Sequence, residues 1–158
     1  MILTKERILK ILLSCQNALS HRKEALVTEG KYATWTRSGG VLIAHLRYVR
    51  ILQFEEYAAL ETELNGLAET EVYPPQAAPR ATRGIDAVII NCDALEYFTS
   101  RLLGILAALS RKLRDAGRKL AVCRLRPEPL RTFRICRLDS IIPVYPSEQE
   151  AREAFAKE

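Results

Sequence analysis

The chain has 158 residues, of which 48% are hydrophobic, so we expect one compact domain with a buried core. Its early apolar run, Leu9–Cys15, is far shorter than the roughly 20 residues that cross a bilayer, and no signal-peptide cleavage site follows it. We therefore expect a cytoplasmic protein without membrane insertion. The four cysteines form no CxxC pair, and the two histidines, His21 and His45, lie far from any cysteine pair, so neither a metal site nor a cofactor is expected.

The net charge of +5 is unevenly distributed along the chain. Residues 53–71 contain six acidic residues and no basic one, whereas residues 101–138 contain eleven basic residues against two acidic ones. The basic stretch is either a solvated helix face or a site that binds nucleic acid, an anionic surface or an acidic protein. Direct nucleic-acid binding is not expected, because Phe133 is the only aromatic residue between Arg111 and Arg137 and no helix-turn-helix pattern appears.

The first segment, residues 1–30, predicts a helical extension. Thr4 is a suitable N-cap, apolar residues follow at helical spacing, and Gly30 is a suitable end. Next we expect an exposed strand from Tyr32 to the tight turn at Gly39-Gly40. A covered strand over Val41–Leu46 and a helix with one apolar face over Phe54–Ala68 follow. Tyr32 and Trp35 either cover an edge of the sheet or mark a contact surface.

The second half of the chain alternates covered strands with one-faced helices, after a proline-rich loop over residues 70–84. The predicted strands are Ile85–Cys92, Leu120–Leu125 and Ile141–Tyr145, and the predicted helices are Ser100–Ala116, Pro127–Leu138 and Ser147–Lys157. This alternation predicts an α/β fold with parallel strand pairs and right-handed crossovers. Because the first two strands meet at a tight turn and must be antiparallel, the sheet is expected to be mixed.

The order of elements, together with four local segments, resembles a known family. These segments are the strand, turn and helix of residues 88–106, followed by residues 116–123, 125–128 and 138–145. From about Tyr32 to Phe155 the chain resembles a STAS domain, the fold of bacterial anti-sigma-factor antagonists. The resemblance implies a mixed β-sheet with helices mainly on one face, as a STAS domain over residues 31–158 that follows the N-terminal extension over residues 1–30.

The resemblance also singles out the start of the helix that begins at Ser100. In the family this turn usually reads aspartate, serine, serine or alanine, glycine, leucine, glycine, and a partner kinase phosphorylates the first serine. Thr99, Ser100, Arg101 and Leu102 take the first four of these positions, and Gly104 matches the last. The resemblance therefore implies phosphorylation of Ser100, with Thr99 as the alternative, and a partner-binding surface made by Thr99, Ser100, Arg101 and Gly104.

Physical chemistry leaves two interpretations of Ser100 open. Thr99 or Ser100 is the helix cap, whose hydroxyl accepts a backbone hydrogen bond worth about 1 kcal/mol. Alternatively, a phosphate on Ser100 adds a charge of roughly −1.5 to −2 at the positive end of the helix, and blocks a docked partner. Gly104 inside the helix costs about 1 kcal/mol relative to alanine, which indicates close packing, most simply against the sheet.

The function implied by the resemblance is partner switching. The protein would bind a serine-kinase anti-sigma factor while Ser100 is unphosphorylated and release it after phosphorylation, which frees a sigma factor. Alternatively, the altered residues Thr99, Arg101 and Leu102 indicate a constitutive STAS subunit of a sensory or transporter-associated complex. An enzyme is not expected, because no phosphate-binding loop, dinucleotide fingerprint or nucleophile elbow is present. A homodimer or a larger assembly stays open.

Overall fold

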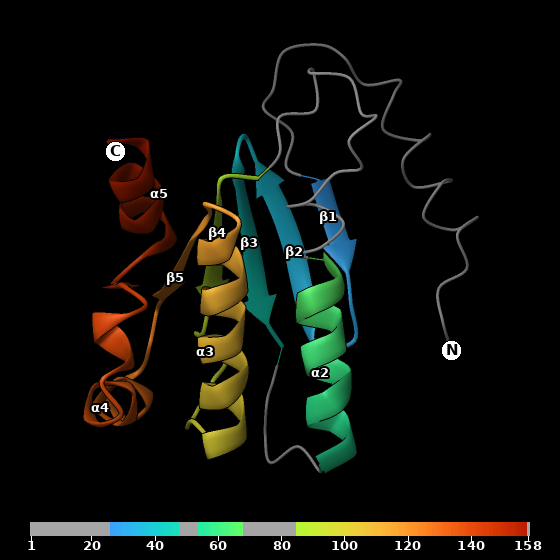
Figure 1. Cartoon of the computed structure of the whole chain (residues 1–158), viewed down its shortest axis with the longest axis vertical. Helices are drawn as coiled ribbons and strands as arrows, with labels where there is room; N and C mark the ends of the chain where they lie inside the picture. Colours follow the sequence, from blue (N-terminus) through green and yellow to red (C-terminus); the bar gives the residue numbers. More distant parts are fainter. Residues whose placement is uncertain (1–25, 48–53, 68–84, 158) are drawn as a thin grey trace, which may run out of the picture.

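The computed structural model describes residues 26–47, 54–67 and 85–157, and these build one six-stranded sheet with helices on both faces (Figure 1). The strands are β1 (Leu26–Glu29), β2 (Ala33–Ser38), β3 (Val41–Leu46), β4 (Ala87–Asn91), β5 (Lys119–Cys123) and β6 (Val144–Tyr145). The helices are α2 (Phe54–Leu67), α3 (Ser100–Asp115), α4 (Pro127–Ile135), the short 3-10 helix η3 (Leu138–Ser140) and α5 (Glu148–Ala156).

The strands follow one another across the sheet in the order β1 to β6. β1, β2 and β3 pair in antiparallel fashion, whereas β3, β4, β5 and β6 are parallel. The turn between β2 and β3 is tight, because Ser38 pairs with Val41 and Gly39 takes a φ of +61° that suits glycine. The predicted mixed sheet is therefore confirmed.

Helices cover the two faces of the sheet unequally. α2 and α3 lie side by side on one face, over the larger core, while α5 covers the other face (Figure 1). β4 shows why both faces must be covered: Val88 and Ile90 point into the larger core, and Ile89 points toward α5. The larger core lies under α2 and α3, as expected for helices mainly on one face.

Helix α3 connects the parallel strands β4 and β5, and its apolar stripe explains its position. One side of the helix is buried against the sheet, through Leu102, Ile105, Leu106, Leu109, Ser110 and Leu113. The helix ends where Gly117 adopts a φ of +70°, which a residue with a Cβ rarely takes. The predicted extent of this helix is confirmed to within one residue at its end.

Three predictions of local structure need correction. The helix predicted to close at Gly30 is wrong at its end, because Leu26–Glu29 forms β1 and pairs with β2. The strand after it is not exposed, since Trp35 is only 1% accessible beneath the helices. The strand predicted to begin at Ile141 is confined to Val144–Tyr145, because the chain first makes the 3-10 helix η3. The predicted helix over residues 1–25 and the loop over 70–84 lie outside the described residues.

Candidate functional site at the start of helix α3

Thr99 is the N-cap of α3 and fixes the start of this helix. Its backbone is extended, with φ −91° and ψ 155°, and its hydroxyl accepts a hydrogen bond from the Leu102 amide at 3.3 Å. The same hydroxyl donates to the buried Tyr57 Oη at 2.8 Å. Thr99 therefore ties the start of α3 to α2, and its hydroxyl is engaged on both sides.

Ser100 is the first residue of α3, and its side chain is exposed. Because Thr99 supplies the cap, the Ser100 hydroxyl is not needed for that role. Among the described residues, no hydrogen-bond partner holds this hydroxyl. Of the two interpretations of Ser100, the structure assigns the capping role to its neighbour and leaves the Ser100 oxygen accessible.

Arg101 and Gly104 extend the exposed surface from Ser100 along the outer side of α3. Ser100 and Gly104 are four residues apart and therefore share one side of the helix. A Cβ built on Gly104 meets no atom within 4 Å, so the predicted close packing at this glycine is wrong. We call the exposed residues Ser100, Arg101 and Gly104, with the half-buried Thr99 beside them, the Ser100 surface.

Leu102 lies on the opposite side of α3 and is only 1% accessible. Its side chain belongs to the core under α3. The leucine at this position, where the family usually has glycine, is thus a change in core packing and leaves the outer surface unaltered. Thr99 likewise keeps the capping role that the usual aspartate would serve, because both residue types are good N-caps. Of the three departures from the usual turn, only Arg101 changes the outer surface.

The loop from β4 to α3 is held in place at several points. Asn91 is buried at the end of β4; its side-chain oxygen accepts from the Asp93 amide at 2.9 Å, and its nitrogen donates to Glu148 Oε1 at 2.6 Å. Phe98 packs on Phe133 of α4 with ring centroids 5.5 Å apart. These contacts give the Ser100 surface a rigid support. The sequence reasoning missed Asn91, whose polar side chain at the end of an apolar strand was the available signal.

Charged groups surround the same edge of the sheet. Arg126 Nε donates to the Asp93 carbonyl at 2.9 Å, and Arg124 Nε lies 3.7 Å from Asp93 Oδ1. His45 Nδ1 lies 3.3 Å from Glu148 Oε1. Both partners of the Arg124–Asp93 pair are more than half exposed, so this ion pair contributes little to the free energy of unfolding.

The cysteines near this edge are not activated nucleophiles. Burial raises the pKa of the Cys92 thiol far above its usual value, and burial also raises the pKa of Cys123 to about 12. Both thiols are therefore protonated at neutral pH, and the thiolate is the reactive form. Within the described ranges, no group of three or more histidine, cysteine, aspartate or glutamate side chains is placed to hold a metal ion. None of the helices in those ranges is long and apolar enough to span a membrane.

Comparison with known families decides what this fold is. The model of the STAS domain family matches residues 8–151. The chain belongs to the STAS domain family. This match confirms the resemblance that the strand, turn and helix of residues 88–106 carried.

Individual STAS proteins show the same relationship. A Bordetella bronchiseptica protein that carries the name anti-sigma factor antagonist BtrV is 29% identical over 98 residues, which are 62% of this chain and 84% of that protein. The crystal structure of an anti-sigma factor antagonist from Mycobacterium paratuberculosis superimposes with a TM-score of 0.57 at 23% identity, over 86% of this chain and 97% of the other. The phosphorylated form of the Bacillus cell fate determinant SpoIIAA superimposes with a TM-score of 0.50 at 11% identity, over 83% and 98% of the two chains. At these identities the two solved structures establish the STAS fold alone.

Proposed function

We propose that this STAS protein is a non-enzymatic, cytoplasmic anti-sigma-factor antagonist that works by partner switching. It binds a serine-kinase anti-sigma factor through the Ser100 surface while Ser100 is unphosphorylated, and releases it once Ser100 carries a phosphate. Family membership and the relative named as an anti-sigma factor antagonist support the general role. The observation that carries the switch is that Thr99 caps α3, which leaves the Ser100 hydroxyl exposed and uncommitted.

The proposed chemical step is a phosphoryl transfer. The γ-phosphoryl group of ATP bound to the partner kinase passes to Ser100 Oγ, ADP leaves, and the hydroxyl proton is released. The product adds a charge of roughly −1.5 to −2 and three strong acceptor oxygens. α3 tolerates this charge because the amide groups of a first helical turn point outward and carry a partial positive charge.

Release of the partner follows from the position of the phosphate. The charge stands on the exposed side of α3, next to Arg101 and one turn before Gly104, in the middle of the proposed contact surface. A partner packed closely there would have to desolvate a dianion, which costs several kcal/mol unless a cation is supplied. The fold is unaffected, because the buried side of α3 does not include Ser100.

A constitutive STAS subunit is the second candidate, and Arg101 is the observation that favours it. An exposed arginine stands where the family's turn has a small residue, so the contact surface differs from the usual one in shape and charge. A partner held in this way would bind regardless of the state of Ser100.

The decisive experiment uses purified kinases of the anti-sigma-factor class from the source organism, with ATP. We expect a single phosphorylated residue, Ser100, by mass spectrometry, and no incorporation into Ser100→Ala. Ser100→Asp should weaken the complex at least about tenfold in a calorimetric titration, the equivalent of about 1.4 kcal/mol. Ser140→Asp is the matched control, because Ser140 is exposed in η3, outside the Ser100 surface, and its hydroxyl donates to the Arg137 carbonyl.

The two candidate functions give different results in the same assay. Phosphorylation at Thr99 alone would move the switch by one residue and refute the proposal for Ser100. A stable complex whose dissociation constant is equal for the wild-type chain, Ser100→Ala and Ser100→Asp would identify the constitutive subunit instead.

A further inference from the structure

A pocket of about 350 Å³ lies at the opposite end of α3 from Ser100. The short β6 explains why a hollow forms there. β6 pairs with β5 only through Val122–Val144 and Cys123–Tyr145, so the first residues of β5, from Lys119 to Ala121, have no strand beside them on this edge. Ile141 and Pro143 line the pocket just before β6 begins, and residues of α3 and α5 line its other sides.

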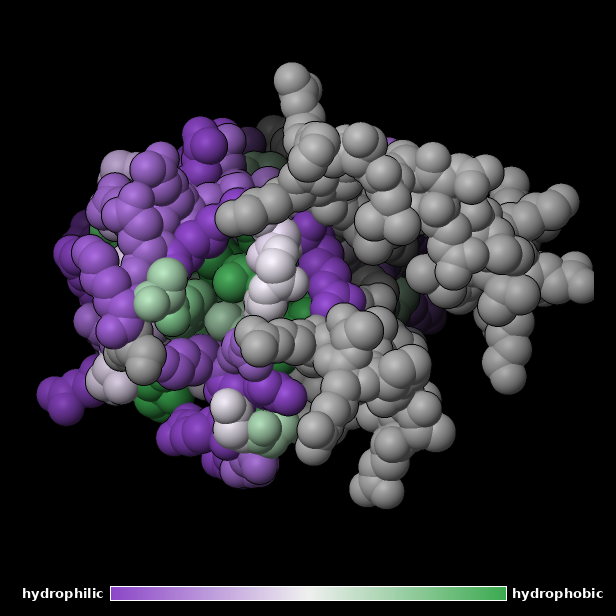
Figure 2. All heavy atoms as spheres, turned by 90° about the horizontal axis from the view of Figure 1, so that it is seen from above, coloured by the Kyte–Doolittle hydropathy of each residue, from purple (hydrophilic) through white to green (hydrophobic). Residues whose placement is uncertain are grey.

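The floor and one wall of the pocket are apolar. Leu120 is buried at the floor, beside the Ser110 side chain from α3. Tyr145 and Phe155 form the wall, with their rings edge to face and their centroids 6.4 Å apart. Ile141 lies on the rim and is 48% exposed. Figure 2 looks down on this end of the molecule and shows hydrophobic surface enclosed by hydrophilic side chains.

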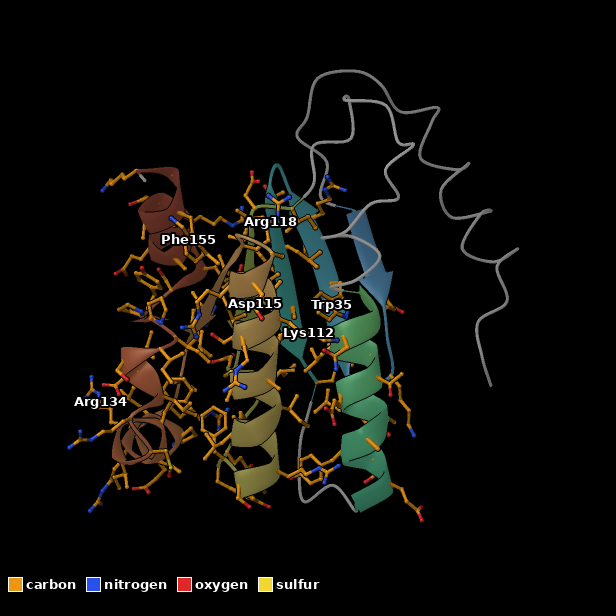
Figure 3. The ribbon with its side chains drawn as sticks, viewed as in Figure 1. Trp35, Lys112, Asp115, Arg118, Arg134 and Phe155 are labelled. Carbon is orange, nitrogen blue, oxygen red and sulfur yellow. The ribbon has the colours of Figure 1, made fainter. Side chains whose placement is uncertain are left out.

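The other wall is positively charged. Arg114, Arg118 and Lys119 all line the pocket, and none of the acidic residues that the structure describes does. Arg118 is held by Asp86, with Nη1 2.7 Å from Oδ1, so the charge of Arg118 is balanced. Figure 3 shows Arg118 just beyond the last turn of α3 and Phe155 on α5, with β5 drawn between the two helices.

The backbone of this region offers one amide donor, beside a helix end whose negative charge is reduced. The last carbonyl groups of α3 are already bonded, because Lys112, Leu113 and Arg114 accept from the amides of Ala116, Arg118 and Gly117. The negative end of the helix is therefore partly neutralised. The amides of Val122 and Arg124 donate toward β6, so the alternation of the strand directs the Leu120 amide to the same edge, where β6 has ended.

From this arrangement we propose that the pocket binds a small organic anion with an aromatic or branched aliphatic body. The body packs against Tyr145, Phe155 and Ile141, while its carboxylate or phosphate group meets Arg114, Lys119 and the Leu120 amide. A volume of about 350 Å³ lies at the lower end of the range for small-molecule sites. α3 has 16 residues, so the pocket lies about 20 Å from Ser100 and is independent of the proposed switch.

The test titrates the full chain with phenyl phosphate and with phenylacetate and follows backbone amide signals by NMR. We expect saturable shifts centred on Lys119, Leu120 and Ile141, with a dissociation constant of about 1 mM or tighter. Inorganic phosphate tests the anion without the ring, and phenethylamine tests the ring with the opposite charge. Binding of only one of the two aromatic anions would support the site and identify its preferred head group.

Variants separate the two walls of the pocket. Arg114→Gln should weaken the binding of phenyl phosphate at least about fivefold, because one charge-assisted contact is lost. Arg131→Gln removes the same charge from an exposed position on α4, outside the pocket, and should change the affinity less than about twofold. Ile141→Ala should weaken the binding of the aromatic anions. It should leave the fold intact, because Ile141 is half-exposed.

Three results would overturn the proposal. Inorganic phosphate binding as tightly as phenyl phosphate would show that the apolar wall contributes nothing. Phenethylamine binding as tightly as phenylacetate would show that the cations contribute nothing. The absence of saturable shifts at Lys119 and Leu120 with either aromatic anion would show that the pocket is not a ligand site.

Discussion

The Thr99 hydroxyl joins two helices: it accepts from the Leu102 amide at the start of α3 and donates to Tyr57 Oη of α2 at 2.8 Å. The cap of α3 is thus also a contact between neighbouring helices. Since Ser100 takes no part in it, the cap and the proposed partner contact fall on adjacent residues. The two roles can be separated by mutation.

Removing the Thr99 hydroxyl should destabilise the fold. In Thr99→Val the Leu102 amide loses its acceptor and the buried Tyr57 hydroxyl loses its donor, so the free energy of unfolding should fall by about 1–3 kcal/mol. Thr99→Ser keeps the oxygen and should cost less than about 1 kcal/mol. Urea denaturation of both variants measures the difference, and equal losses would contradict a role for the hydroxyl.

Changes at Ser100 should behave in the opposite way. Ser100→Ala should alter the free energy of unfolding by less than about 0.5 kcal/mol, because the hydroxyl is exposed and does not cap the helix. Ser100→Asp should be neutral or stabilising by about 0.3–1 kcal/mol, through the positive end of α3. The same denaturation series, repeated in 1 M salt, should remove most of that gain. A loss above 1 kcal/mol in either variant would mean that Ser100 supports the fold.

Gly104→Ala should stabilise the protein. Gly104 is exposed inside α3 and a Cβ there meets no atom within 4 Å, so the change should raise the free energy of unfolding by about 0.5–1 kcal/mol. Gly117→Ala is the matched contrast: its φ of +70° makes a Cβ strained, and stability should fall. If Gly104→Ala also weakens the kinase complex, the residue belongs to the contact surface. Destabilisation by Gly104→Ala would contradict the open space around it.

Gly30 should not tolerate a side chain. A Cβ at this position collides with the Glu63 carboxylate, whose oxygens accept from the amides of Tyr32 at 3.2 Å and Ala33 at 3.0 Å. Gly30→Ala should therefore cost about 1–3 kcal/mol, by displacing a carboxylate that satisfies two backbone donors. In the background Glu63→Ala only the approach to the Ala33 carbonyl oxygen, at 2.9 Å, remains, so the same substitution should cost less. Additive effects in this double-mutant cycle would refute the coupling.

The buried thiols predict a loss of stability at high pH. Burial raises the pKa of Cys123 from 9.0 to about 12, so above pH 9 the unfolded chain releases this proton more readily than the folded one. The contribution of Cys123 is fully present below pH 9 and is lost as the pH rises toward 12. Between pH 9 and 10.5 the free energy of unfolding should fall less steeply in Cys123→Ala than in the wild-type chain. Parallel curves would contradict the shift.

Much of this fold follows from local patterns in the sequence. The uninterrupted apolar run of β4 predicted a strand that is covered on both faces. The apolar stripe of α3 predicted a helix that is buried on one side. β1 was missed because its four residues also continue a helical pattern, and only pairing with β2 makes them a strand. The contact between Asn91 and Glu148, which supports the site, could not be predicted for a related reason. The two residues are 57 positions apart, and nothing in the local sequence indicates that they meet.

Gly104 illustrates the limit of reasoning from propensity. A glycine inside a helix indicates a special requirement, yet the pattern does not say whether that requirement lies in the core or outside it. The structure places Gly104 on the exposed side of α3, so packing against the sheet is not the explanation.

The inward orientation of Leu102 bears on how relatives of this protein should be sought. A motif search that demands glycine there penalises a change that no partner can detect from outside, since the side chain is buried. Scoring only the outward-facing positions of the turn would retain such divergent members. It would also group them by the residue at the position of Arg101, which is the outward-facing position where a different partner would require a different side chain.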